Sequence, residues 1–463
     1  MMKKNYWLLG IVLLSVLIRL IFAFSYHELW WDSGVYLGMG KYAFSGGESG
    51  LWEHIRPPFV PLMLGVIWKI GLDPVFLGRI AEILMMGGVV ALTFLLAKEW
   101  FNERVAILSS IILALSPIFF YLSFHQYAEI PSVLFFLLAL YFGSKRPFLA
   151  GVCCAFAFLS KFPTGIVLAV LGAVFLLNAN WAALMYLLAG FSLAVSPYFI
   201  ATIFAYGSPL ATLSAAQDAI ARALGCNVLR YRPWWYYGYW LFFSESKLHL
   251  FSILGVGVLF KNWKRRQVVF AFALVLPLLY FLPMQCRDYR YLTLFLPFIV
   301  MLTSLGIVWL VERLNKRWFV PVVAVISICL AALCFNFYLG ERALPNAIEQ
   351  EFFELPQKSE VQGEIWTGNP IVAAFTNKRL EKVYYPIYDA KLAKDFNSYV
   401  ELHSDRIGMV LLENCGGGLI CPPDDADCEE ETTRLIERLD ERFTRIFDKS
   451  RGRCWYRAWI SVE

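Results

Sequence analysis

Charged residues are scarce in this sequence: they make up 17% of its 463 residues, against 59% that are hydrophobic, and the mean hydropathy is +0.57. A soluble domain usually has an apolar share of about 45 to 50%. The formal net charge of +5 is modest and the basic residues form no clustered patch, which argues against a nucleic-acid partner. The composition therefore indicates a polytopic membrane protein.

The sequence also lacks the motifs that mark many nucleotide-binding and repeat proteins. It contains no P-loop, no Gly-x-Gly-x-x-Gly, no fixed-period repeat and no low-complexity tract. A cleavable leader is not indicated either, because the apolar run 6–24 is long for a signal peptide and the residues 25–27 after it lack a small-x-small cleavage pattern. We expect this run to be an uncleaved first span.

The membrane topology is predicted from apolar segments of about 17 to 25 residues and from the excess of Lys and Arg in cytoplasmic loops. Lys3 and Lys4 put the N-terminus in the cytoplasm, and the basic run 264–266 is the strongest cytoplasmic marker. The segment 59–72 is short and interrupted, so we expect a surface helix that does not cross. About eleven spans remain, at 6–24, 76–96, 105–124, 131–142, 148–159, 163–177, 181–204, 248–260, 268–284, 291–311 and 319–338.

The C-terminal segment 340–463 changes character, because charges become frequent and no run is long enough to span a membrane. We therefore predict two domains: a transmembrane domain, 1–339, with an outer loop at 25–58, and a soluble extracytoplasmic domain, 340–463. The second should be a small α/β domain, with strands at 364–367, 407–412 and 454–460 and helices at 389–402 and 429–443.

Four cysteines fall in this C-terminal segment, an even number consistent with two disulfides in an oxidising compartment. Their spacing is not the Cys-x-x-Cys type of a metal site, and the sequence leaves the pairing open. Four others lie within expected spans and are interpreted as small apolar packing residues. The first set is Cys415, Cys421, Cys428 and Cys454, and the second is Cys153, Cys154, Cys329 and Cys334.

The outer loop 25–58 concentrates charge beside aromatic residues. Asp32 follows Trp30 and Trp31, and tryptophan is enriched at membrane interfaces. Arg56 precedes a Pro-Pro pair, which biases its backbone away from helix just before the next helix begins. A carboxylate and a guanidinium on one loop are suited to act as a base and a phosphate clamp.

The predicted topology brings further ionisable residues to this outer face, from six stretches of the chain in all. Burying such groups at membrane depth costs at least about 2.5 kcal/mol each, so they are usually paired or functional. Cations outnumber the two carboxylates, a balance that suits an anionic, lipid-linked substrate. The residues are Asp32, Arg56, Arg79, His125, Glu129, Lys161, Arg287 and Arg290.

In their order and sidedness these features resemble the polyprenyl-phosphate-dependent GT-C glycosyltransferases. The nearest group is the protein mannosyltransferase and aminoarabinose transferase group, also called the glycosyltransferase 39 family. The resemblance covers about residues 1 to 310. It is carried by the aspartate after the first span, the basic-Pro-Pro end of its loop, Arg79 opening the next span, the acidic Glu129 after the third span, the Gly151 to Lys161 element, and a late Arg290-Tyr291 motif followed by Pro297.

The resemblance implies a glycosyltransferase that moves a sugar, with inversion, from a polyprenyl phosphate to a hydroxyl of a protein or lipid-linked glycan acceptor. Asp32 would be the general base, and Arg56 and Lys161 would stabilise the charge that develops on the phosphate. Glu129 would orient the sugar or the acceptor. Arg79, His125, Arg290 and Tyr291 complete the expected substrate-binding set.

Two departures from the group's pattern matter. Many members place a glutamate directly after the aspartate, but Ser33 stands here, which removes the most obvious partner for a divalent cation. We therefore predict no metal ligands, although a divalent cation stays compatible with the architecture. Many members carry Lys or His before the Pro-Pro, whereas Arg56 retains the charge and adds bidentate geometry.

Several alternatives remain open from the sequence. Asp32 would cap a helix that begins near Ser33, and Arg56 would contact a lipid headgroup. For the whole protein, the alternative is a transporter or flippase of a lipid-linked or anionic substrate, although such proteins usually show internal repeats and midplane charges. A membrane-anchored binding protein would leave the charged loop unexplained.

Overall fold

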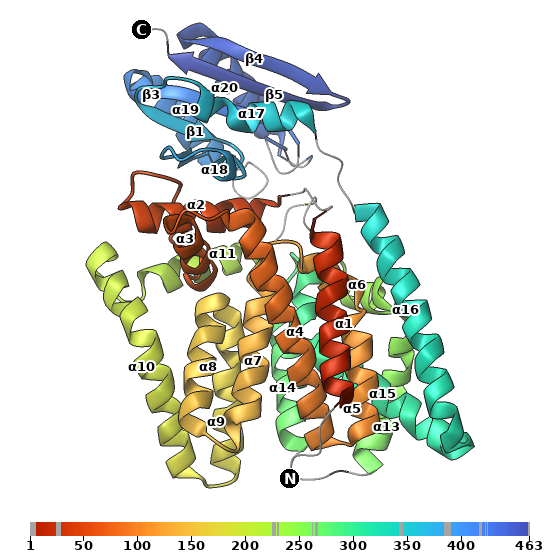
Figure 1. Ribbon diagram of the computed structural model, residues 1–463. Helices are drawn as coiled ribbons and strands as arrows, with labels where there is room; N and C mark the ends of the chain where they lie inside the picture. Colours follow the sequence, from red (N-terminus) through yellow and green to blue (C-terminus); the bar gives the residue numbers. More distant parts are fainter. Residues whose placement is uncertain are drawn as a thin grey trace.

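The computed structural model describes residues 6–24, 29–224, 228, 231–261, 263, 267–341, 346–383, 390–415, 419–421, 423 and 425–461. Within these ranges the chain forms a bundle of helices with a mixed sheet stacked on one end (Figure 1). The topology markers Lys3, Lys4 and 264–266 lie outside the described residues and stay predictions. Helix α1 begins at the end of the bundle far from the sheet (Figure 1).

Apolar helices make up the bundle, and five of those described are long and apolar enough to cross a membrane. The other six of the eleven expected spans correspond to shorter or interrupted helices, so helix length does not fix the number of crossings. The five are α1 (Tyr6–Ala23), α4 (Pro74–Trp100), α10 (Trp181–Tyr206), α15 (Leu292–Leu314) and α16 (Phe319–Glu341). The shorter apolar helices are α3 (Phe59–Lys69), α7 (Glu129–Gly143), α8 (Pro147–Ser160), α9 (Ile166–Leu177), α13 (Phe251–Lys261) and α14 (Gln267–Phe281).

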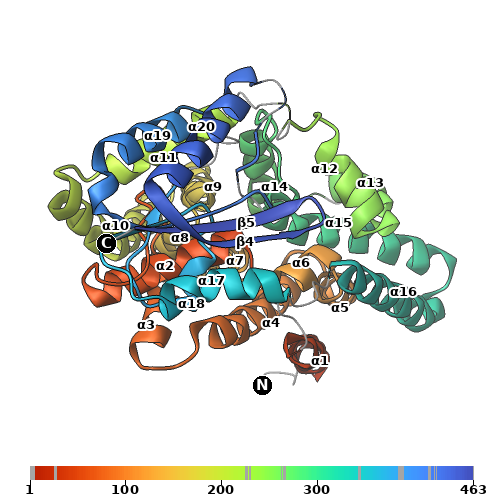
Figure 2. The same ribbon diagram turned by 90° about the horizontal axis from the view of Figure 1, so that it is seen from above.

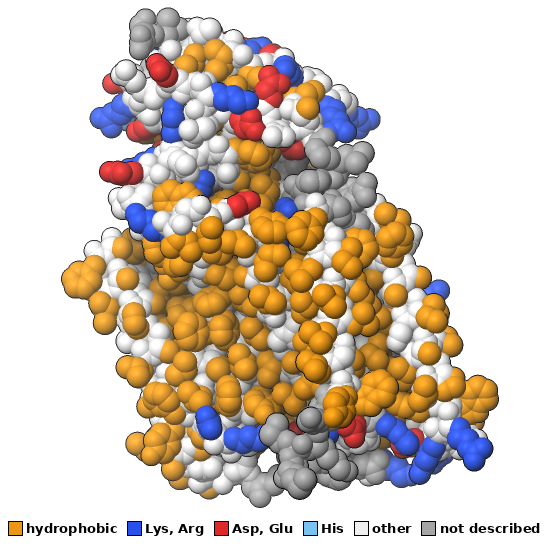
Figure 3. All heavy atoms as spheres, in the orientation of Figure 1, with side chains coloured by type: hydrophobic (Ala, Val, Ile, Leu, Met, Phe, Trp, Pro, Cys, Tyr) orange, Lys and Arg blue, Asp and Glu red, His pale blue; other side chains and the backbone are white. Residues whose placement is uncertain are grey.

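The surface of the molecule shows where a bilayer would lie. In Figure 3 hydrophobic side chains cover the middle of the visible face, and charged side chains gather at the lower end and over the sheet at the top. An uninterrupted apolar belt between two charged ends is expected of a membrane protein. The chain is therefore a mostly helical, multi-pass membrane protein.

The expected span 105–124 is not one helix. It divides into α5 (Glu103–Ala114) and the short α6 (Pro117–Leu122). Pro117 has no backbone N–H to continue the first helix, and the Ser116 hydroxyl accepts a bond from the Phe119 N–H at 3.3 Å, which starts the second. The sequence did not indicate this break, because hydrophobicity continues across it, and the span itself stays a prediction.

Two helices lie between the bundle and the sheet (Figure 1). Helix α2 (Trp31–Ser45) occupies much of the expected outer loop and ends at Gly46, whose φ of 72° gives a left-handed cap. Helix α3 has 11 residues, and its place as a surface helix that does not cross stays a prediction. Two further helices follow the long α10: α11 (Ala211–Leu224) and α12 (Tyr236–Tyr239).

The sheet is mixed and has five strands in the order β2-β1-β3-β5-β4. Strand β1 pairs in parallel with β2 and β3, and β5 pairs antiparallel with β3 and β4. The strands are β1 (Glu364–Thr367), β2 (Glu381–Lys382), β3 (Ile407–Glu413), β4 (Phe443–Arg451) and β5 (Cys454–Ser461). The helices are α17 (Ala347–Lys358), α18 (Val372–Phe375), α19 (Ala390–His403) and α20 (Ala426–Arg442). The sequence missed α17, α18, β2 and β4.

The central strand β3 is buried along its whole length, because both faces of the sheet are covered. Helices α19 and α20 pack on one face around Trp459. On the other face, Val35 and Met39 of α2 join Phe352 and Val372 in one apolar cluster. Figure 2 shows β4 and β5 passing over α2. We call the residue stretch 346–461 the C-terminal unit below. It shares an apolar core with α2, which lies between the bundle and the sheet.

The boundary predicted between residues 339 and 340 falls in the last turn of α16, which ends at Glu341. The division into a transmembrane and a soluble domain stays a prediction. The shared apolar cluster nevertheless joins the two parts through α2.

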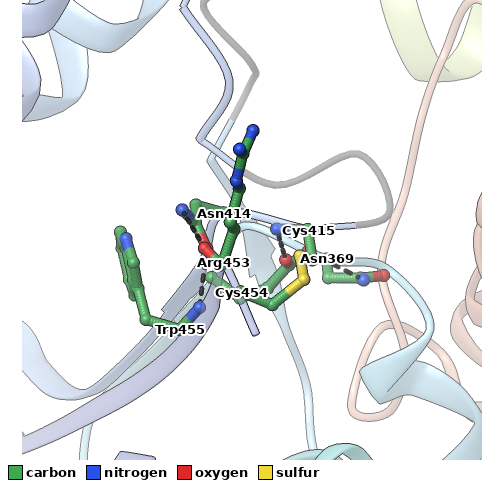
Figure 4. The surroundings of a disulfide bond; sticks show 7 residues. Asn369, Asn414, Cys415, Arg453, Cys454 and Trp455 are labelled. Carbon is green, nitrogen blue, oxygen red and sulfur yellow. Dashed lines mark hydrogen bonds between the residues drawn. A yellow bond between two sulfur atoms is a disulfide. The ribbon is translucent and has the colours of Figure 1, made fainter. Parts of the chain in front are cut away.

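Two disulfides tie the C-terminal unit together, as predicted, and the structure supplies their pairing. Cys415 bonds to Cys454 and Cys421 to Cys428. Beside the first of these, Asn414 accepts a hydrogen bond from the Trp455 N–H at 2.7 Å (Figure 4). Cys286, before α15, is also disulfide-bonded. The cysteines of the expected spans, Cys153, Cys154, Cys329 and Cys334, are free.

Candidate active site

Asp32 lies in the first turn of α2 and is held by two guanidinium groups. Arg56 Nη2 is 2.8 Å from Asp32 Oδ1, and Arg290 Nη1 is 2.6 Å from Asp32 Oδ2. The helix begins two residues earlier than expected, with Trp30 as its N-cap. Asp32 is therefore not the cap of α2, and that alternative is wrong.

Local structure sets both arginines toward the carboxylate. Arg56 is followed by Pro57 and Pro58, after which α3 begins. Arg290 sits in a short 3-10 turn, Tyr289–Tyr291, whose N-cap is Asp288. Asp288 accepts hydrogen bonds from the backbone N–H of Arg290 at 2.9 Å and from its Nη2 at 2.8 Å. The guanidinium is thus oriented from both sides.

Two more residues extend this arrangement on the Arg56 side. Glu53 Oε2 lies 2.9 Å from Arg56 Nε, and the other carboxylate oxygen of Glu53 forms an ion pair with Lys382 from β2. The result is an alternating series that we call the ion-pair chain: Lys382, Glu53, Arg56, Asp32, Arg290 and Asp288. Its three cations and three carboxylates sum to zero.

This balance holds within the ion-pair chain, where Glu53 and Asp288 offset the cations. An anion that binds here must therefore compete with carboxylates for the guanidinium groups. The wider set of predicted outer-face residues, which includes Arg79 and Arg287, keeps its excess of cations.

A separate ion pair lies beside the ion-pair chain. Lys161, at the C-terminus of α8, is 2.8 Å from Glu129 Oε1 at the start of α7. Its Nζ is also 4.7 Å from the centre of the Tyr291 ring. The charge of Lys161 acts on Asp32, so the pair belongs to the same site.

Arg79 and His125 have different surroundings. Arg79 Nε donates to the Phe124 backbone carbonyl at 3.0 Å. His125 is 1% exposed and packs edge-on against Trp30 and Tyr121, with ring centres 5.8 and 4.5 Å apart. Burial, then the charges of Arg79 and Arg290, lower the pKa of His125 well below its ordinary value. Both side chains are buried, and substrate binding by either of them stays a prediction. Arg287, also predicted at this face, donates to the Leu282 carbonyl at 2.8 Å.

The electrostatics of Asp32 follow from its two partners. Burial by itself would raise the pKa of Asp32, but the charges of Arg56, Arg290 and Lys161 outweigh it and hold the pKa well below its usual range. The carboxylate is therefore ionised at any physiological pH, and it is a weak proton acceptor while both guanidinium groups stay in place.

The arrangement does not fit a metal ion at Asp32. Both carboxylate oxygens of Asp32 bind guanidinium groups. Across the part of the chain that the structure describes, no group of three or more His, Cys, Asp and Glu side chains is placed to hold a metal.

The sequence predicted Asp32, Arg56 and Arg290 but missed the other three members of the ion-pair chain. For Glu53 a signal was present, since it lies three residues before Arg56. For Asp288 the signal was the acidic residue two positions before Arg290. Lys382 had none, because its strand is two residues long and far away in the sequence.

The comparisons with known proteins concern the family and the fold. Residues 55–203 match the model of a family described as dolichyl-phosphate-mannose-protein mannosyltransferase. The matched stretch includes Arg56, Glu129 and Lys161, and it excludes Asp32 and Arg290. No curated protein sequence matches the chain.

Solved structures extend the likeness to nearly the whole chain. The crystal structure of ArnT from Cupriavidus metallidurans bound to undecaprenyl phosphate has a TM-score of 0.65 at 14% identity and covers 98% of each chain. Its apo form gives a TM-score of 0.66, at 14% identity, over 97% of this chain and 98% of that one. The archaeal oligosaccharyltransferase AglB from Archaeoglobus fulgidus, solved with an inhibitory peptide and a dolichol-phosphate, gives 0.59 at 12% identity, over 89% of this chain and 70% of that one.

The fold is thus the one seen in the ArnT and AglB structures. Together with the matched segment 55–203, this similarity confirms the resemblance predicted from the sequence, to GT-C membrane glycosyltransferases of the protein mannosyltransferase and ArnT type.

Proposed function

We propose that the protein transfers a sugar from a polyprenyl phosphate to an acceptor hydroxyl, with inversion at the anomeric carbon. The observation that carries this proposal is the carboxylate of Asp32 between two guanidinium groups, at 2.8 Å from Arg56 and 2.6 Å from Arg290. A base beside phosphate-binding cations is what this transfer requires. The undecaprenyl phosphate in the related ArnT structure and the dolichol-phosphate in AglB support the choice of donor.

The reaction proceeds in one displacement. The acceptor oxygen attacks the anomeric carbon and forms the new glycosidic bond while the bond from that carbon to the phosphate oxygen breaks. The electron pair leaves with the polyprenyl phosphate, and the acceptor proton passes to Asp32. Arg56 and Arg290 stabilise the charge that develops on the leaving phosphate.

Donor binding also prepares the base. In the structure both oxygens of Asp32 are engaged by guanidinium groups, which keeps its pKa low. A donor phosphate that recruits Arg56 withdraws one of these groups and raises the basicity of the carboxylate. Asp32 then accepts a proton only when a donor is present, so an acceptor is not deprotonated in the absence of a donor.

The pair of Lys161 and Glu129 is assigned to substrate orientation. Glu129 is 5% exposed and fixed by Lys161 at 2.8 Å, while Lys161 keeps 18% of its side chain accessible. A partly accessible cation beside the phosphate-binding arginines can contact the donor, and the carboxylate behind it can hold a sugar hydroxyl.

The site is proposed to lie on the extracytoplasmic face. The disulfides Cys415–Cys454 and Cys421–Cys428 are in the C-terminal unit, which covers the site. Disulfides persist in oxidising compartments. The positive-inside bias assigned the same face to Asp32, Glu129 and Arg290.

The test is sugar transfer by purified protein in lipid nanodiscs, with a panel of radiolabelled polyprenyl-phosphate sugars. The variant Asp32→Asn keeps the shape of the side chain but cannot accept a proton at neutral pH. We expect its kcat to fall by about 10² to 10⁴, the usual contribution of a general base. Asp405→Asn, at an exposed position of the C-terminal unit, is the matched control.

Equal turnover by the wild type and Asp32→Asn would remove Asp32 from catalysis. Absence of turnover with every donor, combined with translocation of a labelled lipid by the wild type, would favour the transporter alternative.

A further inference from the structure

Lys382 reaches the site from the C-terminal unit. It lies in strand β2, paired in parallel with Thr367 of β1. Its side chain is 7% exposed and forms an ion pair with Glu53, whose side chain is 2% exposed. Its Nζ also lies 4.8 Å from the centre of the Trp31 ring, next to Asp32 in the sequence. A lysine this deeply buried beside a catalytic carboxylate needs an explanation beyond folding.

The backbone fixes Lys382 in place. The Leu380 N–H donates to the Gly50 carbonyl at 2.7 Å, and the Gly50 N–H donates to the Lys378 carbonyl at 3.0 Å. The stretch that precedes Lys382 is therefore hydrogen-bonded to the loop that carries Glu53. These bonds hold the backbone of β2 close to the backbone of that loop.

Glu53 divides its charge between two cations. One carboxylate oxygen binds Lys382 and the other binds Arg56 at 2.9 Å. Without Lys382, the buried carboxylate of Glu53 would have Arg56 as its principal ion-pair partner among these residues. Glu53 would then hold the Arg56 guanidinium more tightly. The availability of Arg56 for another anion therefore depends on Lys382.

We propose that Lys382 is a positioning residue which, through Glu53, leaves Arg56 available to the phosphate of the donor. The C-terminal unit thereby completes the donor site of the bundle. This inference rests on the proposed function, because it concerns the binding of the same polyprenyl-phosphate donor.

Charge balance gives the proposal a distinctive test. Lys382→Met removes one cation and leaves Glu53 to bind Arg56 alone, so we expect KM for the donor to rise about tenfold, with kcat within about twofold. Adding Glu53→Gln removes the surplus carboxylate, so the double variant should return to within about threefold of the wild-type KM. Lys382→Arg keeps the charge and should rescue donor binding. Lys358→Met, which removes a 61% exposed lysine of the same unit, is the matched control.

The outcomes separate the two proposals. Absence of wild-type turnover with every donor overturns the proposed function. With wild-type turnover present, three results overturn the role of Lys382: an unchanged KM in Lys382→Met, equal impairment in Lys382→Arg, or a double variant at least as impaired as Lys382→Met. Thermal unfolding of each variant is measured in parallel. If Lys382→Met does not fold, the comparison of Lys382→Arg with the double variant decides.

Discussion

Two carboxylates of this protein have pKa values shifted in opposite directions. Asp32 is surrounded by cations, and its pKa falls although burial acts against this. Glu413, at the end of β3, is 1% exposed and has no cation among the contacts described for it. Burial raises the pKa of Glu413 to about 8, while hydrogen bonds from the Cys415 backbone and from Asn369 act in the other direction. Only the second of these carboxylates titrates near neutral pH.

This difference predicts a pH-dependent stability of the C-terminal unit. Because the folded-state pKa of Glu413 lies above its ordinary value of 4.5, its contribution to stability is full below pH 4.5 and is lost as the pH rises toward 8. Glu413→Gln stays neutral, so its melting temperature should fall less than that of the wild type between pH 5 and pH 8. Differential scanning fluorimetry at the two pH values measures this. An identical pH dependence in both proteins would contradict it.

At this same scale, the sequence identified residues better than it identified their partners. Asp32 and Arg56 stand out because an acidic and a basic residue share one charged loop. Arg290 stands out because it lies at the start of an apolar span. Lys382 could not be found, since only the pairing of β2 with β1 brings it to Glu53. A contact between residues more than three hundred positions apart leaves no trace in local composition.

Among the elements, α2 connects the site to the C-terminal unit. It carries Asp32 in its first turn and packs Val35 and Met39 against the C-terminal unit. Close approach is possible because Gly34 has no side chain: a Cβ there would lie 2.6 Å from the Ile371 backbone nitrogen and 2.7 Å from the Pro370 carbonyl carbon. Backbone atoms cannot move aside as flexible side chains do.

We therefore expect Gly34→Ala to force α2 away from residues 370–371. Overpacking of this kind costs about 1–3 kcal/mol, so the melting temperature should fall, and transfer activity with it, because Asp32 moves with the helix. Gly10→Ala is the matched control, since a Cβ at Gly10 of α1 meets nothing within 4 Å. Both variants are compared by thermal unfolding and by donor turnover. Wild-type stability in Gly34→Ala would show that the contact is not tight.

The elements also show what periodicity alone misses. Strands β1 and β3 were predicted nearly to the residue: β3 is a mostly apolar run, and β1 alternates in burial along its sequence EIWT. Strand β4 follows the expected helix 429–443 and was not predicted, because its sequence FTRIFDKSR is mostly polar and only Phe443 and Phe447 are buried. The break before α6 was missed, although Ser116-Pro117 is a recognisable start of a helix.

For the whole molecule, ion pairs connect loops that were predicted to share a side. Lys145 pairs with Glu99 at 2.8 Å, and Arg104 pairs with Glu312 at 2.6 Å, all in loops or helix ends assigned to the cytoplasm. Asp32, Arg56 and Arg290 meet at the other end. These two ion pairs agree with the predicted grouping of their loops, whereas the sequence could not show that α2 packs against the C-terminal unit.

The orientation predicted for the protein can be measured by cysteine labelling. Leu402, in the C-terminal unit, and Leu314, at the end of α15, are 73% and 75% exposed. In sealed right-side-out vesicles, Leu402→Cys should react with a membrane-impermeant maleimide, and Leu314→Cys only after permeabilisation. The exposed free Cys329 is first replaced by Ala. The reverse pattern would place the site in the cytoplasm.

The neutrality of the ion-pair chain affects how a substrate finds this protein. Three cations and three carboxylates in alternation produce a field that decays within a few ångströms, so little long-range attraction draws an anion from solution. A soluble sugar phosphate would therefore gain no electrostatic attraction from the ion-pair chain as it approaches. A lipid-borne one arrives by lateral diffusion in the bilayer and meets the arginines only at contact, which makes membrane anchorage itself the first level of substrate selection.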